Sequence, residues 1–193
     1  MVSYDFSHSR TSTSVNKELT LFLIICDMDN HVRPHFQQAE LEALTQCVNW
    51  PIQSVFYYNW INTSAENAFQ FVYAVELNFK NNYSLLVTSG DPDDKPKLCF
   101  NAVDVAMEKM EVDRAFNGVL TIESEEVTQN APWTDWVGKE IDQVEIDFDK
   151  EKKLYFADYM ILKQADNYLL IRIGQSGDGV DVLIIDKEQM QSN

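Results

Sequence analysis

Apolar and polar residues alternate through much of this chain in runs of strand length, separated by short polar turns. Such runs favour β-strands, because every second side chain of a strand faces the same side of its sheet. The pair Asn81-Asn82 and the stretch 175–179, QSGDG, are turn signals that join neighbouring runs as hairpins. Strands are therefore expected over 18–26, 51–60, 69–79, 80–90, 97–103, 117–127, 140–149, 154–164, 167–174 and 179–186.

Three stretches depart from this alternation and indicate helices. The segment 34–48 has apolar residues at helical spacing and Pro34 near its start. The segment 104–116 mixes apolar and charged residues in the same spacing, and 128–139 predicts a helical turn closed by Gly138. We therefore predict an α+β fold, built predominantly of antiparallel β meanders with a few helices.

The first and second halves of the chain resemble each other in the order of their predicted elements. Ile52 aligns with Ile141 and Leu77 with Leu162 when one short gap is allowed, and each half reads as a short helix followed by a meander. This pattern predicts an internal repeat and two related lobes. The expected parts are a frayed N-terminus over 1–16, an N-terminal α+β lobe over 17–128 and a C-terminal β-meander lobe over 129–193.

Acidic residues outnumber basic residues by 31 to 15, which gives a formal net charge of -16. Nucleic acids and anionic membrane surfaces would be repelled, because both are bound through Lys and Arg. A basic protein would be attracted, and its rate of encounter would rise. We therefore expect a basic protein partner, no nucleic acid and no membrane; the oligomeric state is not determined by these features.

The three cysteines, Cys26, Cys47 and Cys99, are odd in number and widely spaced. They form no C-x-x-C pair for zinc or redox chemistry, and free thiols in a reducing compartment are the simplest interpretation. The N-terminal residues are polar, and the apolar run 19–25 is too short to span a bilayer. These features predict a cytoplasmic protein without a cofactor.

The stretch 21–30, LFLIICDMDN, ends in two aspartates one residue apart. An apolar strand followed by D-x-D resembles the first motif of haloacid dehalogenase-like hydrolases. The resemblance implies a Mg²⁺-dependent phosphohydrolase in which Asp27 is the nucleophile and Asp29 the general acid and base. It further implies that Thr88 in SLLVTSG binds phosphate, and that the Mg²⁺ ligands are Asp27, Asp178 and Asp181.

That family requires a parallel sheet whose strands alternate with crossover helices. The segments that lead to SLLVTSG and SGDGVD read as hairpins instead. The hydrolase is therefore kept as the alternative to a protein-binding function, and a structural or carbohydrate-binding module is a third hypothesis.

The size, acidity and repeated meander of the chain resemble small bacterial toxin-immunity proteins, and the stretch 133–144, WTDWVGKEIDQV, is similar in style to modules of such proteins. The resemblance implies a non-catalytic, immunity-type inhibitor that covers a basic partner with an acidic and aromatic face. Exposed aromatic side chains are typical of protein-binding faces, and an acidic field around them attracts a basic partner. The candidate partner-binding residues are Tyr57, Tyr58, Trp60, Asp91, Asp93, Asp94, Glu123, Glu125 and Glu126.

Overall fold

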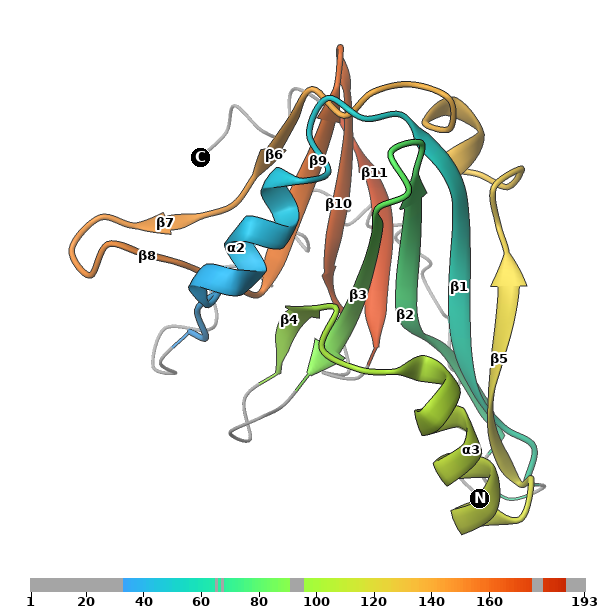
Figure 1. The fold of residues 1–193 in the computed structure, drawn as a ribbon. Coiled ribbons are helices and arrows are strands. Elements are labelled where there is room, and N and C mark those ends of the chain that lie inside the picture. The colour runs from blue at the N-terminus through green and yellow to red at the C-terminus, as the bar shows by residue number, and fades with distance from the viewer. Residues whose placement is uncertain (1–32, 65, 67, 91–95, 175–178, 187–193) are drawn as a thin grey trace, which may run out of the picture. The chain divides into compact units, whose positions relative to one another are not determined.

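A computed structural model describes most of the chain after residue 32 (Figure 1). The described residues are 33–64, 66, 68–90, 96–174 and 179–186. They form an α+β fold of mostly antiparallel strands, which confirms the predicted fold class. The helices are α2 (Gln38–Thr45), α3 (Val105–Phe116) and the short 3-10 helix η1 (Trp133–Asp135).

The first group of strands forms the large sheet, in the order β4-β3-β2-β1-β5, with every neighbouring pair antiparallel. Asn82 has a φ of 62° in the turn between β2 and β3, as the Asn-Asn turn signal predicted. The strands are β1 (Ile52–Asn62), β2 (Phe69–Phe79), β3 (Ser84–Gly90), β4 (Lys97–Phe100) and β5 (Leu120–Glu126).

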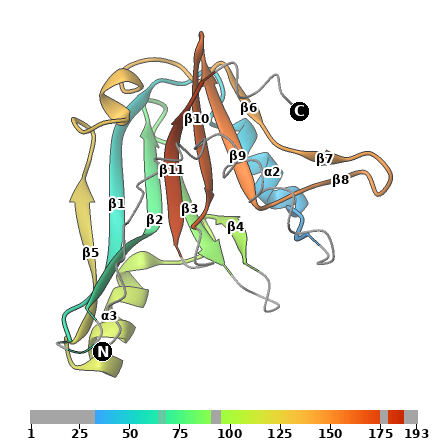
Figure 2. The same cartoon turned by 180° about the vertical axis from the view of Figure 1, so that it is seen from behind.

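The second group forms the small sheet, in the antiparallel order β11-β10-β9-β6, which Figure 2 shows from behind. A separate hairpin of β7 and β8 stands between β6 and β9 in the chain. The elements are β6 (Gln143–Glu145), β7 (Phe148–Asp149), β8 (Leu154–Tyr155), β9 (Tyr159–Gln164), β10 (Asn167–Ile173) and β11 (Val180–Ile185).

The prediction of one continuous strand over 140–149 is wrong, because β6 and β7 belong to different sheets. The break follows from Asp147, whose carboxylate lies 2.8 Å from Nη1 of Arg33 and whose carbonyl accepts a hydrogen bond from Phe156 N–H at 3.0 Å. Phe148, which lies near the apolar face of the predicted strand, is 39% exposed on the hairpin instead.

The two sheets share one hydrophobic core. Ile52, Val55 and Leu77 of the large sheet belong to the same buried cluster as Leu162 and Leu169 of the small sheet, and all are fully buried. A second cluster lies where α3 packs on the large sheet and consists of Val112, Leu120 and Ile122.

Each sheet contains four strands in a meander of the same order, β1-β2-β3-β4 and β6-β9-β10-β11. The corresponding first strands differ greatly in length, with 11 residues in β1 and 3 in β6. The internal repeat is not confirmed and stays a prediction, as do the lobe boundaries at 16/17 and 128/129. In the described ranges, no helix has the length and apolar character needed to cross a membrane.

Candidate functional site: the open edge of the large sheet

β5 lies at one edge of the large sheet, and β1 is the strand that pairs with it. In an antiparallel pair, backbone hydrogen bonds join every second residue of each strand. Thr63 N–H donates to the Val119 carbonyl at 3.0 Å, and Val127 N–H donates to the Val55 carbonyl at 2.9 Å. These two bonds show that odd-numbered residues of β5 are the ones bonded to β1.

The backbone groups of the even-numbered residues Ile122, Ser124 and Glu126 therefore point away from β1, and we call them the open edge. Among the described residues, no strand pairs with this side of β5. Unpaired strand edges of this kind are templates for pairing with another chain.

Helix α3 covers the beginning of the open edge. Its Lys109 donates a hydrogen bond from Nζ to the carbonyl oxygen of Ile122. Val112 on the same helix packs against Ile122, which is 1% exposed. The Ile122 carbonyl is thus occupied, whereas Ser124 and Glu126 are exposed along the rest of the edge.

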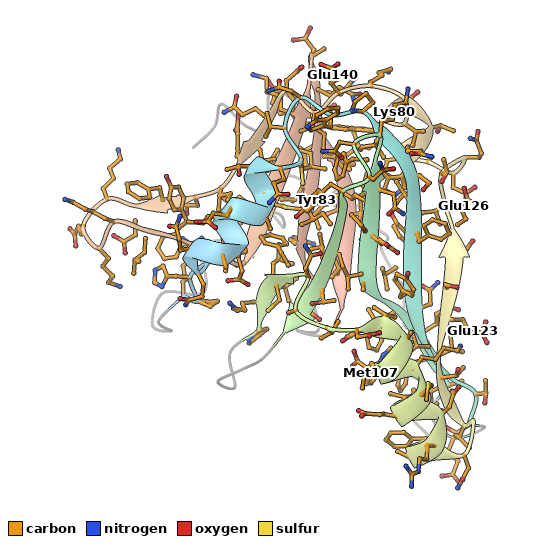
Figure 3. All side chains as sticks on the ribbon, in the orientation of Figure 1. Lys80, Tyr83, Met107, Glu123, Glu126 and Glu140 are labelled. Carbon is orange, nitrogen blue, oxygen red and sulfur yellow. The ribbon has the colours of Figure 1, made fainter. Side chains whose placement is uncertain are left out.

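The side chains of this part of β5 are acidic and exposed. Glu123 and Glu125 project on the face that carries their cross-strand neighbours Asn59 and Tyr57, and Glu126 projects on the opposite face. Figure 3 shows Glu123 and Glu126 on β5 at this border of the sheet. None of the ion pairs found in the described part of the chain involves these glutamates. Carboxylates therefore flank the open edge on both faces.

Tyr57 lies next to the acidic strand but faces the shared core. Its hydroxyl accepts a hydrogen bond from Nε1 of Trp133 at 2.8 Å, and the two rings meet edge to face with centroids 6.5 Å apart. Burial raises the pKa of Tyr57, the Trp133 hydrogen bond lowers it, and the negative charge of Glu125 raises it. Tyr57 thus links the large sheet to η1 and is only half exposed.

Tyr58 and Trp60 face the other side of the large sheet, where both pack against the cluster beneath α3. The Tyr58 hydroxyl donates to a carboxylate oxygen of Glu76 at 2.5 Å. Trp60 contacts Tyr73 with ring centroids 5.5 Å apart. The aromatic candidates lie on the strand that pairs with the acidic one, and Tyr57 is directly opposite Glu125, but all three aromatic residues are half-buried.

Helix α3, which packs against β5, carries exposed apolar side chains. Met107 is 59% exposed and Met110 is 70% exposed, one turn apart on the helix. Methionine is flexible and polarisable, and it recurs on surfaces that accommodate partner proteins. Figure 3 shows Met107 on α3.

The other candidate partner-binding residues, Asp91, Asp93 and Asp94, lie outside the described residues. The same holds for Asp27, Asp29 and Asp178 of the hydrolase alternative.

Two residues of the hydrolase alternative are described. Thr88 is 1% exposed within β3, and Asp181 on β11 accepts a hydrogen bond from Arg172 at 3.3 Å. The described residues contain no group of three His, Cys, Asp or Glu side chains suited to a metal ion. Their ladders are antiparallel, whereas the hydrolase resemblance implies a parallel sheet. The catalytic assignment of Asp27, Asp29 and Thr88 stays a prediction without support from the described part of the chain.

Lys109 was not among the residues expected from the sequence. Its role depends on α3 lying beside β5, and no local pattern in 105–116 distinguishes this lysine from a solvated one. The open edge itself was equally hidden, because strand order is set by pairing between residues as distant as Phe56 and Glu126. The run of glutamates in 123–126 was the one signal available.

In comparisons with protein-family models, with curated proteins and with solved structures, nothing matches this chain.

Proposed function

We propose that this chain is a non-catalytic binding protein that captures a basic protein partner, in the manner of an immunity-type inhibitor. The proposal depends on one observation, the open edge of β5 with Glu123, Glu125 and Glu126 exposed around it. Opposite charge on the partner raises the rate of encounter, and contacts made after docking set the rate of release. The formal net charge of -16 extends this attraction beyond the contact surface.

The exposed methionines of α3 support the same proposal. A charged edge alone binds weakly, because solvent and salt screen exposed ion pairs. Met107 and Met110 supply exposed apolar area on α3, the helix that packs against β5, and a partner that reaches this helix can bury it to slow its release.

A cytoplasmic location accompanies this proposal. Cys47 and Cys99 are free, buried thiols, which is consistent with a reducing compartment.

The test uses the full chain and a synthetic peptide of alternating lysine and valine as the basic probe. The edge variant combines Glu123→Gln, Glu125→Gln and Glu126→Gln. The control variant combines Glu42→Gln, Glu140→Gln and Glu151→Gln, three exposed glutamates away from β5. Both variants lose the same formal charge, so long-range attraction falls equally in the two.

We expect the dissociation constant of the peptide to rise about tenfold in the edge variant, because up to three exposed charge pairs are lost. The control variant should bind within about twofold of wild type, since it loses only the screened long-range attraction. Isothermal titration calorimetry at low and physiological salt measures both. An equal loss in the two variants, or no binding of the peptide to wild type, would contradict the proposed site.

A further inference from the structure

We propose that the partner binds by strand addition: an extended, basic segment of the partner protein pairs with the open edge at Ser124 and Glu126. This inference rests on the proposed function and specifies how the partner is held. The large sheet would gain a strand beside β5, opposite the side occupied by β1.

The backbone of β5 is ready for this pairing. The N–H and carbonyl groups of Ser124 and Glu126 point away from β1, as the alternation of the β1–β5 hydrogen bonds requires. In an added antiparallel strand, the residue opposite Ser124 and the residue opposite Glu126 would each exchange two backbone hydrogen bonds with β5. The added strand ends near Ile122, because Lys109 already occupies the carbonyl of that residue.

Charge decides which strand can be added. A second copy of the same edge would place glutamates opposite glutamates, and like charges in cross-strand positions are destabilising. A strand with Lys or Arg opposite Glu123 and Glu125 makes favourable cross-strand pairs on one face of the sheet, and Glu126 attracts a further cation on the other. The open edge therefore excludes self-pairing and favours a basic strand, a recognised mode of peptide binding.

A proline at position 124 separates strand addition from simple charge attraction. Ser124→Pro removes the outward N–H and places a ring on the edge, while the hydrogen bonds between β5 and β1 use the odd-numbered residues and are kept. Ser124→Ala is the matched control, because it removes the hydroxyl and retains the N–H. All three carboxylates remain in both variants.

The lysine–valine peptide should bind Ser124→Ala as it binds wild type and should bind Ser124→Pro at least about tenfold more weakly, since backbone hydrogen bonds are lost. Equal affinity for the two variants would overturn strand addition. Urea unfolding of each variant establishes that the comparison is made between folded proteins.

A second measurement leaves the protein unchanged. The same peptide with every backbone amide N-methylated keeps its side chains and charge but has no N–H group to donate to a strand ladder. Wild type should bind it at least about tenfold more weakly than the parent peptide. Amide hydrogen exchange should show protection at Ser124 and Glu126 with the parent peptide only.

The outcomes distinguish the two proposals. Strand addition is overturned if wild type binds the parent and the N-methylated peptide equally. If the Glu123, Glu125 and Glu126 variant then binds neither, the acidic site itself is retained. If that variant binds both peptides as tightly as wild type does, the proposed function itself is overturned.

Discussion

The two edge strands of the large sheet, β4 and β5, have opposite surroundings. Leu98, Cys99 and Phe100 of β4 are buried, and the Leu98 N–H donates to the Ala157 carbonyl at 2.6 Å. Four consecutive residues of β5, from Glu123 to Glu126, are exposed, and no described strand continues the sheet beyond them. In the described part of the chain, one edge is covered by the protein itself and the other pairs with no further strand.

Side-chain chemistry explains this difference. At the closed edge, the Phe100 ring stacks on Phe36 with centroids 4.9 Å apart, and Lys97 Nζ lies 3.0 Å from a carboxylate oxygen of Glu40. Covering the apolar residues of β4 stabilises the folded state. Covering the glutamates of β5 would cost free energy unless each acquired a cation. Within the described residues, the acidic edge is accordingly the one left unpaired.

The largest contrast is expected in thiol reactivity. Burial raises the pKa of Cys99 on the closed edge, so less of the reactive thiolate is present at about pH 8 than for an exposed thiol. Ser124→Cys places a thiol on the open edge. In a Cys26→Ser background, iodoacetamide should modify the introduced thiol more than about a thousandfold faster than Cys99, which reacts only after local opening.

Cys47 serves as an internal reference in that experiment, because burial raises its pKa to about 12. Raising the pH toward about 8.5, the ordinary pKa of a thiol, should accelerate the reaction of the introduced thiol, while Cys47 stays protonated. Peptide mass mapping after timed quenching gives the rates. Modification of Cys99 within tenfold of the rate of the introduced thiol would show that the β4 edge is not closed.

The next contrast is in the free energy of unfolding. Leu98→Ala on the closed edge should lower it by about 2–5 kcal/mol, because Leu98 is 0% exposed and its loss leaves a cavity in the shared core. Ser124→Ala on the open edge should change it by less than about 0.5 kcal/mol. Urea unfolding followed by circular dichroism measures both, and similar losses would remove the distinction between the edges.

The smallest expected effect tests where the open edge ends. Lys109→Met removes the hydrogen bond to the Ile122 carbonyl and should lower the free energy of unfolding by about 0.5–1.5 kcal/mol. The freed carbonyl extends the open edge, so the affinity for the lysine–valine peptide should rise about threefold through one more hydrogen bond. Lys109→Arg, which keeps a donor, is the control; an affinity that rises as much in this variant would contradict the assigned role of Lys109.

Much of the strand pattern could be predicted from the sequence, but not the burial of its aromatic residues. The run Phe56, Tyr57, Tyr58 and Trp60 showed rings on both faces of one strand. Which rings are accessible depended on what covers each face. Trp133 covers Tyr57 from a position 76 residues away, and α3 covers Tyr58 and Trp60.

The acidic candidates were predicted in part. Glu123, Glu125 and Glu126 are exposed, as a solvated run of acids indicates, and they lie beside the aromatic strand that was grouped with them. The regular alternation over 140–149 led to the wrong prediction of one continuous strand. Local periodicity carries no information about Arg33, whose ion pair with Asp147 accompanies the break between β6 and β7.

By itself the sequence determined the α+β character of this protein, its helices around 38–45 and 105–116, and its acidity, since these follow from spacing, turn residues and composition within short windows. Only the tertiary structure decided that β4 is covered and that no described strand pairs with the outer side of β5. Strand order depends on pairing between residues far apart in the chain, and the free energy of covering an edge depends on side chains that other elements bring to it.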